Sequence, residues 1–244
     1  MSLLKMIHTA LIVEPRDLKR LPLIINHFHF TLGESWKIVF YCGNGMRHKW
    51  ISKVNREVEI RELPTTNLLP WEYSDLLKSE LLWKSLYGEF VLVFQADTWI
   101  MNEPPYTIDY FLQMNKAYIG GNMAYNWFEM DFRTPFPTYN GGLSLRKRSD
   151  MLRIIEAFPP MLTYYNPGNP DRSTHPPFTA MAEDVYFTQG AYFLNIPLGD
   201  YSEDCFHFAI HTIFYPQAFG IHCPHDHIKQ HLINLYPEIQ TAYI

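Results

Sequence analysis

The sequence predicts an α/β fold in which a mixed, mostly parallel central sheet is flanked by helices within a single domain. Short apolar runs typical of buried strands alternate with segments whose apolar residues recur at helical spacing through about the first hundred residues. Hydrophobic residues make up 47% of the 244 residues and charged residues only 18%. A chain of this composition can bury a substantial core, which excludes a disordered protein.

The expected strands of the first half are short apolar runs that stop at turn residues. The first run ends at Glu14-Pro15-Arg16, and residues 90–94 are apolar throughout, as in strands buried on both faces. Two other segments carry apolar residues three or four positions apart and stop at Gly33 and Gly88, which predicts helices. The expected strands are residues 9–13, 36–41, 58–63 and 90–94, and the expected helices are residues 18–32 and 74–87.

The second half differs in composition from about residue 120 onward. Glycine, proline and aromatic residues dominate residues 118–140, and a long proline-rich loop is expected over residues 166–179. A helix is expected to start near Val185, and residues 219–222 have the pattern of a short strand. We therefore expect two halves, 1–120 and 121–244, within the domain 1–244.

Charge and cysteine content exclude several classes of protein. The formal net charge is −5, whereas a protein that binds nucleic acid as its main partner needs a basic excess. No apolar run approaches the roughly 18 residues of a membrane span, and residues 1–11 do not resemble a signal peptide. Cys42, Cys205 and Cys223 are odd in number and far apart, so the expected compartment is the cytoplasm, without a disulfide framework.

A single acid follows the most apolar of the expected strands. Asp97 comes just after residues 90–94, and ligands of open α/β sheets bind at the carboxyl ends of the strands. A carboxylate there can hold a divalent cation against a diphosphate, because hard cations take oxygen ligands. The alternative is a strand-end aspartate that caps the next turn.

Two later segments carry groups that could act on a ligand. Paired glycines after Asn140 let the backbone approach a ligand closely, although Asn-Gly is also common in hairpin turns. Glu183-Asp184 precedes an expected helix, where acids commonly complement the helix dipole. A carboxylate in an aromatic cleft can instead be a general base that takes a proton from an attacking hydroxyl.

The last forty or so residues concentrate histidine and cysteine. Their spacing is looser than the knuckles of structural zinc sites, and scattered core or surface histidines remain the more common explanation. One of these residues, His222, is a candidate third ligand for a cation at Asp97, because a short strand could deliver it. The cluster comprises Cys205, His207, His211, His222, Cys223, His225, His227 and His231.

With these motifs in this order, the chain resembles the GT-A glycosyltransferases, a family that includes glycogenin-like enzymes. The fold of that family is Rossmann-like. The run of residues 78–83 followed by residues 90–100 is similar to their helix, strand and acid unit. The chain also resembles a glycosyltransferase-like family known as a domain of unknown function, over about residues 8–225. It shares Gln-x-Asp-Thr at 95–98, Asn-Gly-Gly-x-Ser-Leu-Arg at 140–146, Glu-Asp-Val-x-Phe at 183–187 and Phe-Gly-Ile-His at 219–222.

The resemblance implies a role for each motif. Asp97 would bind the metal together with His222, while Gln95 stands where the first acid of Asp-x-Asp would be and removes one negative charge. Asp184 would be the catalytic base and Glu183 would grip a sugar hydroxyl. After His222 the chain reads Cys-Pro-His-Asp-His, which departs from the expected basic residue, Pro and Trp. The implied nucleotide-sugar-binding residues are Val13, Glu14, Arg16, Lys78, Gln95, Ala96, Asp97, Asn140, Gly141 and Gly142.

The implied activity is a metal-dependent, inverting transfer of a sugar from a nucleoside-diphosphate donor, with UDP as the expected nucleotide, to a glycan or glycoconjugate hydroxyl. The implied cofactor is Mn²⁺ or Mg²⁺, and the implied role is polysaccharide biosynthesis. In this account residues 1–120 bind the donor and residues 121–244 shape the acceptor site. A homodimer through exposed tail aromatics, or contact with a membrane surface through the acceptor, is left open.

Two alternatives to this activity remain. The first is an inactive protein that binds a glycan or a nucleotide sugar, which Gln95 in place of an acid favours. The second is a zinc-dependent hydrolase or a zinc module built from the C-terminal histidines and cysteines.

Overall fold

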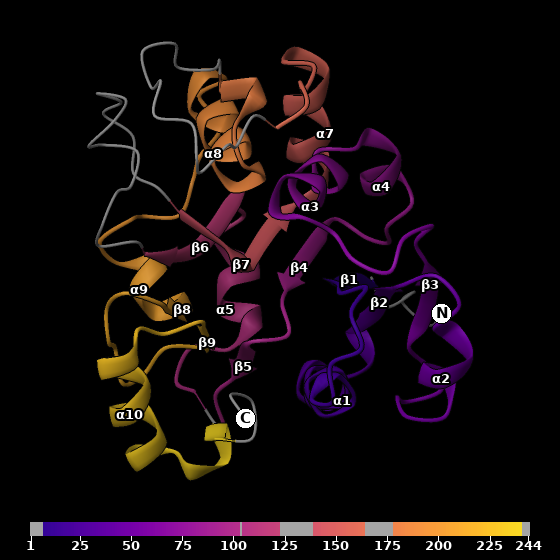
Figure 1. Ribbon diagram of the computed structural model, residues 1–244. Coiled ribbons are helices and arrows are strands. Elements are labelled where there is room, and N and C mark those ends of the chain that lie inside the picture. Colours follow the sequence, from indigo (N-terminus) through magenta and orange to yellow (C-terminus); the bar gives the residue numbers. More distant parts are fainter. Residues whose placement is uncertain (1–6, 103, 123–138, 164–177, 241–244) are drawn as a thin grey trace, which may run out of the picture.

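Figure 1 shows the computed structural model, which describes residues 7–102, 104–122, 139–163 and 178–240. Its centre is a six-stranded sheet with the strand order β3-β2-β1-β4-β7-β6. The strands are β1 (His8–Val13), β2 (Trp36–Cys42), β3 (Glu59–Glu62), β4 (Phe90–Phe94), β6 (Tyr118–Asn122) and β7 (Tyr139–Lys147). The expected strands of the first half are therefore confirmed, with ends that differ by at most one residue.

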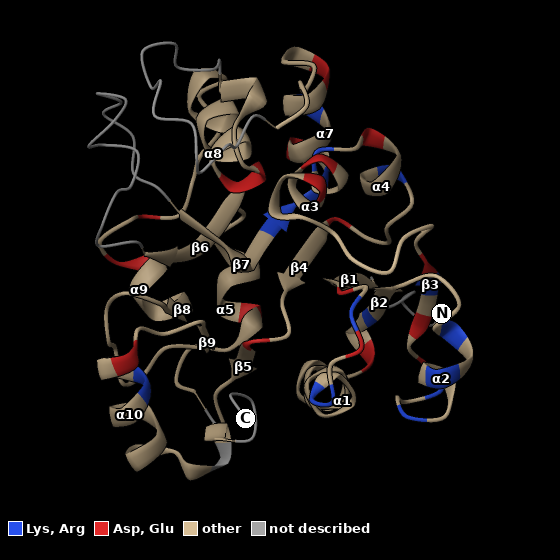
Figure 2. Cartoon of the chain, viewed as in Figure 1, with Lys and Arg blue, Asp and Glu red and all other residues tan. Residues whose placement is uncertain are grey.

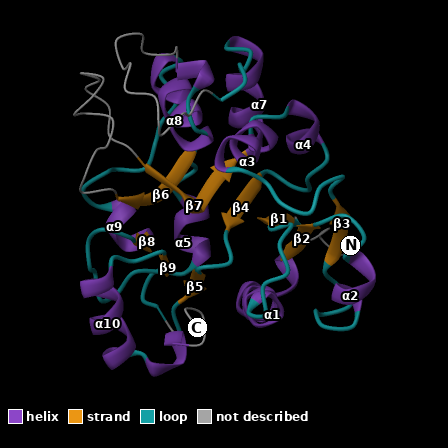
Figure 3. Cartoon of the chain, in the orientation of Figure 1, coloured by secondary structure: helices purple, strands orange, loops and turns teal. Residues whose placement is uncertain are grey.

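The sheet is mixed. β1 is parallel to both β2 and β4, and β2 is parallel to β3, whereas β7 is antiparallel to β4 and to β6. Every residue of β1 and of β4 is buried, which explains why both segments are apolar almost without interruption. The predicted α/β class, with a mixed sheet flanked by helices, is confirmed (Figure 3).

The order of the strands creates a crevice between β1 and β4. From β1 the chain moves outward through β2 to β3, then returns to place β4 on the other side of β1. Because β1 and β4 are parallel, their carboxyl ends, at Val13 and Phe94, lie at the same edge of the sheet. Ligands of open α/β sheets bind outside the carboxyl ends of the strands where the strand order reverses in this way.

A second, three-stranded sheet lies next to this edge. It has the order β5-β9-β8 and consists of β5 (Thr98–Ile100), β8 (Ala209–Ile210) and β9 (Gly220–His222). β5 and β9 are antiparallel, and their register pairs Thr98 with His222. The pairing brings His222 beside the residues that follow β4, and the short strand expected at residues 219–222 is confirmed.

The helices form two groups around the sheets. α3, α4, α7 and α8 pack against one another, and α8 also packs against β7; Figure 1 shows this group at the top of the view, with α1 and α10 at the bottom. No described helix is both long enough and apolar enough to cross a membrane. The helices are α1 (Leu21–Leu32), α2 (Arg47–Ile51), α3 (Pro70–Leu77), α4 (Glu80–Lys84), α5 (Ile108–Gln113), α7 (Arg148–Ala157), α8 (Glu183–Phe193), α9 (Asp204–Phe208) and α10 (Asp226–Leu235), with 3-10 turns at Gly33–Ser35, Phe178–Ala180 and Pro237–Ile239.

The prediction of one continuous helix over residues 74–87 is wrong. The segment is divided into α3 and α4, because the chain leaves the helix at Lys78 and Ser79 has extended dihedral angles before α4 begins. Leu77, Leu82 and Trp83 are buried in the same core, so the apolar periodicity runs across the break and hides it. The proline-rich loop expected over residues 166–179 falls largely outside the described residues.

Candidate functional site

A cavity of about 570 Å³ opens at the carboxyl ends of β1 and β4. Its walls come from the segments after β1 and β4, from the segment that enters α3, and from the starts of β7 and α8, with the end of β9 completing it. The cavity brings together most of the residues that the sequence predicted for the site. These are Val13, Glu14, Arg16, Gln95, Ala96, Asp97, Asn140, Gly141, Gly142, Glu183, Asp184 and His222.

Lys78 is the exception, and the expectation that it contacts the nucleotide sugar is not supported. It lines a separate cavity, and its side chain is only 1% exposed. The Lys78 ammonium donates to the carbonyl oxygens of Met161 and Met181 and to the hydroxyl of Thr163, at 2.8, 3.2 and 2.6 Å. Lys78 therefore joins α3 to the segment that leads into α8, because a buried ammonium must have all its protons bound.

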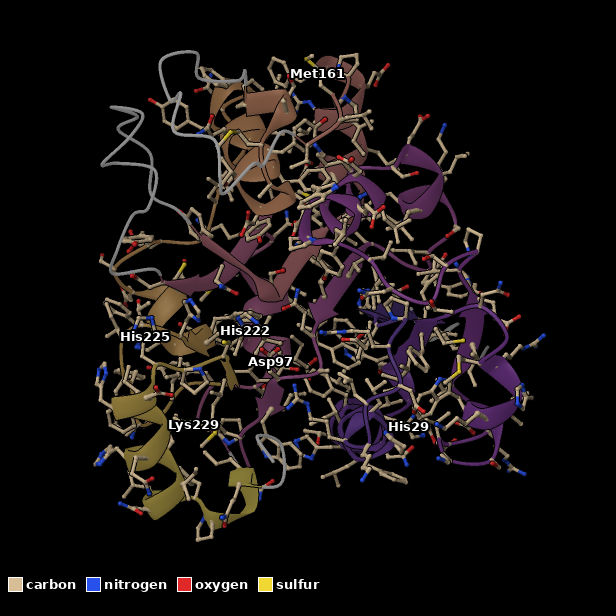
Figure 4. The ribbon with its side chains drawn as sticks, viewed as in Figure 1. His29, Asp97, Met161, His222, His225 and Lys229 are labelled. Carbon is tan, nitrogen blue, oxygen red and sulfur yellow. The ribbon has the colours of Figure 1, made fainter. Side chains whose placement is uncertain are left out.

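Three donor atoms converge just after β4. Nε2 of His222 lies 3.0 Å from Oε1 of Gln95 and 3.4 Å from Oδ1 of Asp97. Figure 4 shows Asp97 and His222 next to each other. Burial alone would raise the pKa of Asp97, but the hydrogen bond and the charge of His222 outweigh it and hold that pKa at about 2. Asp97 is therefore a carboxylate at any physiological pH.

This donor set fits a divalent cation. Adjacent ligands of an octahedral ion bound at about 2.1 Å lie about 3.0 Å apart, close to the spacing of these atoms. Carboxylate and amide oxygens are ligands of Mg²⁺ and Mn²⁺, and imidazole suits the transition metal. No group of three His, Cys, Asp or Glu side chains converges within the described parts of the chain, so the amide of Gln95 is needed as the third donor.

Buried polar atoms without hydrogen-bond partners also mark this cavity. Among the described residues, Nε of Arg20 and Nδ1 of His222 are buried and have no partner, and both side chains belong to its walls. Buried polar groups normally have partners, because the loss of water costs free energy. A polar ligand in the cavity would supply them.

A network of hydrogen bonds fixes the orientation of Asn140. Nδ1 of His211 lies 2.9 Å from the carbonyl oxygen of His222 and must donate to it, because a carbonyl only accepts. Burial lowers the pKa of His211 to about 4, so the ring is neutral and its Nε2 accepts from the Asn140 amide at 3.3 Å. The Asn140 oxygen then accepts the Gly142 amide hydrogen at 2.8 Å.

Glu183 is half of a buried ion pair with Arg146. The guanidinium donates to both carboxylate oxygens of Glu183, and the two side chains are 0% and 6% exposed. Figure 2 shows the acidic start of α8 beside the basic end of β7. Both oxygens of Glu183 are already engaged within the protein, so its expected grip on a sugar hydroxyl is not supported. Sequence reasoning assigned no role to Arg146, although an arginine in a buried strand signals a partner.

Asp184 is the carboxyl group suited to proton transfer at neutral pH. Burial, together with the neighbouring charge of Glu183, raises its pKa from an ordinary value of 3.8 to about 7. One oxygen accepts the backbone amide hydrogen of Val185 at 2.8 Å. That bond shows that Asp184 also satisfies part of the helix start, so the two interpretations of this residue hold together. A base with a pKa near the working pH is the most effective.

One known protein family matches a large part of the chain. Residues 57–222 match the family described as a protein of unknown function, DUF5672. The chain belongs to the DUF5672 family. The matched span contains Asp97, the Asn140 turn, Asp184 and His222, whereas β1 and the residues that follow it precede the span. No curated protein matches the chain at a significant level.

The C-terminal histidines and cysteines of this DUF5672 protein do not form a zinc site in the described structure. Cys205 is buried in the core, and His207 stacks on Tyr106 with 4.1 Å between ring centroids. His231 packs edge-on against Phe214. His222 and His211 reach the neighbourhood of the cavity through the contacts described above, and the backbone amide of Cys223 donates to the carbonyl oxygen of Asp97 at 3.2 Å. The zinc module expected as an alternative therefore has no support in the geometry.

The paired glycines that follow Asn140 are required by close contact. A Cβ atom on Gly142 would lie 2.1 Å from Nε2 of His222, and one on Gly141 would lie 2.4 Å from Oε1 of Glu183. Distances this short force the neighbour to move. The glycines thus allow a metal-ligand candidate and a buried carboxylate to lie directly against β7.

We expect Gly142→Ala to displace His222 and to weaken Mn²⁺ binding by about tenfold or more. The overpacking should also cost about 1–3 kcal/mol of unfolding free energy. Calorimetric titration with Mn²⁺ and urea unfolding measure the two effects. In a His222→Ala background the same substitution should cost little stability, because the clashing ring is gone. An equal cost in both backgrounds would show that the clash with His222 is not the cause.

Proposed function

We propose that this DUF5672 protein is a GT-A-like glycosyltransferase. It transfers a sugar from a nucleoside-diphosphate donor, a UDP-sugar, to a hydroxyl of a glycan or glycoconjugate acceptor, with inversion and with Mn²⁺ or Mg²⁺ as cofactor. The observation that carries the proposal is that one cavity, placed where the strand order reverses, contains both the donor set of Asp97, Gln95 and His222 and a carboxyl group with a pKa of about 7, that of Asp184.

In this reaction the protein's own residues bind the donor and accept one proton. The oxygen of the acceptor hydroxyl forms a bond to the anomeric carbon of the donor sugar. Asp184 takes the proton of that hydroxyl as the bond forms. The bond from that carbon to the diphosphate oxygen breaks, and the electron pair leaves with the diphosphate. Attack from the face opposite the leaving group inverts the configuration. A cation held by Asp97, Gln95 and His222 would offset the negative charge of the departing diphosphate.

The surrounding contacts prepare these groups. The pair of Arg146 with Glu183 holds the start of α8 against β7, which fixes Asp184 in the cavity. The bond from Asn140 to the Gly142 amide holds the turn that faces His222. Because these groups are ordered before a ligand arrives, little free energy is needed to arrange them during the reaction.

A protein that binds nucleotide sugars without transfer is the second candidate. Gln95, which lacks the charge of an acid, favours it. Its amide oxygen nonetheless faces His222 at 3.0 Å, so the position keeps an oxygen donor. Turnover of a UDP-sugar to UDP, with an acceptor or with water, distinguishes the two candidates.

Metal-dependent nucleotide binding is the direct test of the proposed function. We expect calorimetry to show UDP binding that needs Mn²⁺, and weaker or no binding of GDP and dTDP. Asp97→Ala should weaken the Mn²⁺-dependent binding by at least about tenfold. Asp17→Ala, which removes an acid outside the cavity whose side chain is 51% exposed, is the control and should bind as the wild type does. Absence of binding by all three nucleotides would reject the proposal.

A further inference from the structure

Some of the described charged side chains around the cavity are paired with an opposite charge, and others are not. Its carboxylates include Glu14 and Glu183, and each is paired with an arginine. Arg16 donates to both oxygens of Glu14, at 2.8 and 2.7 Å, and Arg146 does the same for Glu183. Arg146 is fully buried in its pair, and Glu14 occupies the Nε and Nη2 atoms of Arg16.

Arg20 differs from both of these arginines. It is the residue just before α1, and it lines the cavity. Its Nε atom is buried, and among the described residues it has neither a hydrogen-bond partner nor a carboxylate within ion-pair distance. Arg20 and Asp97 line the same cavity.

A partly buried guanidinium without an anion is costly, and its planar fork matches the oxygens of a phosphate group. Lys78, the other basic residue expected at the site, is excluded because its protons are bound to Met161, Thr163 and Met181. Arg20 is thus the arginine in the described walls that no carboxylate pairs with, which leaves its fork for an anionic ligand.

We propose that Arg20 binds the phosphate groups of the donor and so sets the direction in which the donor lies in the cavity. The diphosphate lies between Arg20 and the Asp97 end, and the sugar extends toward Gly141 and Asp184. This inference rests on the proposed function and adds to it a specific phosphate ligand, which sequence reasoning did not identify. The signal that could have found it is an arginine a few residues after the first strand, beside the crevice.

The test measures the binding of inorganic pyrophosphate and of UDP by calorimetry in the presence of Mn²⁺, with Mn²⁺ alone as a separate titration. Arg20→Gln should weaken both pyrophosphate and UDP by about 10- to 100-fold, which is the range for hydrogen bonds to charged groups. Arg20→Lys should recover part of the affinity, because it keeps the charge and loses the fork. Lys19→Gln removes an equal charge from an exposed neighbour and should have little effect.

Binding of Mn²⁺ alone separates this role from damage to the site. Removal of a positive charge near Asp97 should leave Mn²⁺ affinity unchanged or raise it, whereas a misfolded variant would lose it. If the wild type binds UDP and Arg20→Gln binds it equally well, the inference on Arg20 is wrong and the proposed function stands. If pyrophosphate binds through Arg20 and no nucleotide binds, the phosphate role stands and the proposed function fails. Failure of both ligands would overturn both.

Discussion

Arg146→Met should destabilise the protein by about 3–5 kcal/mol, because it leaves the carboxylate of Glu183 buried without its partner. Arg146 is fully buried, and its guanidinium also lies 4.8 Å from the ring centroid of Tyr118. Its remaining hydrogen bonds go to Ser144 and to the carbonyl of Gly141, so the loss also reaches the turn that lines the cavity. Urea unfolding at neutral pH measures the change.

A double-mutant cycle identifies the ion pair as the cause. Arg146→Met combined with Glu183→Leu removes both charges, and the combined cost should be smaller than the sum of the single costs by at least about 2 kcal/mol. Arg153→Met, which alters an exposed arginine of α7, is the matched control and should change stability by no more than about 0.5 kcal/mol. Strict additivity of the two single costs would contradict the argument.

Asp184→Asn should strongly reduce turnover and yet stabilise the protein at neutral and alkaline pH. An amide cannot take the acceptor proton, so the rate should fall by about 100-fold or more. In the wild type, the rate should rise with pH as Asp184 loses its proton around pH 7. Initial rates of UDP release from the preferred UDP-sugar, measured from pH 5.5 to 8.5, test both statements.

The stability effect follows from the direction of the pKa shift. The folded protein holds the Asp184 proton up to about pH 7, whereas the unfolded chain loses it near 3.8. The contribution of this group to stability is therefore complete below about pH 4, declines as the pH rises to about 7, and is absent above that. The unfolding free energy of Asp184→Asn, relative to that of the wild type, should therefore rise by about 1–3 kcal/mol as the pH is raised from 5 to 8.

The matched control is Asp226→Asn, which changes an exposed acid in the first turn of another helix, α10. This substitution should change the unfolding free energy by no more than about 0.5 kcal/mol at pH 5 and at pH 8. If the difference between Asp184→Asn and the wild type does not depend on pH, then Asp184 does not have the raised pKa that its proposed role as base requires.

Much of the fold could be predicted because its signals are local. The apolar runs of β1 and β4 and the helical spacing of α1 reflect burial of each element, and burial requires apolar residues wherever the partner lies. The break between α3 and α4 was missed for the same reason. The apolar pattern continues across it, and the buried contacts of Lys78 involve residues more than eighty positions away.

The candidate site divides in a similar way. Position in the chain made Asp97 and His222 candidates, because one follows a buried strand and the other could be delivered by a short strand, whereas the role of Asp184 as base came from the family resemblance. Neither gave information on whether a group was free. Glu183 and Arg16 are bound to partners, and Lys78 faces another cavity, while Arg20 was passed over although its Nε has no described partner.

The sequence by itself determined that this chain forms an α/β sheet and that its acids, glycines and histidines follow strands where a ligand could bind. Only the tertiary structure decided which of these groups face one another and which charges are already neutralised. The reason is physical: the tendency to form a strand or a helix depends on neighbouring residues in the chain, whereas pKa values, ion pairs and cavities depend on atoms brought together from distant segments.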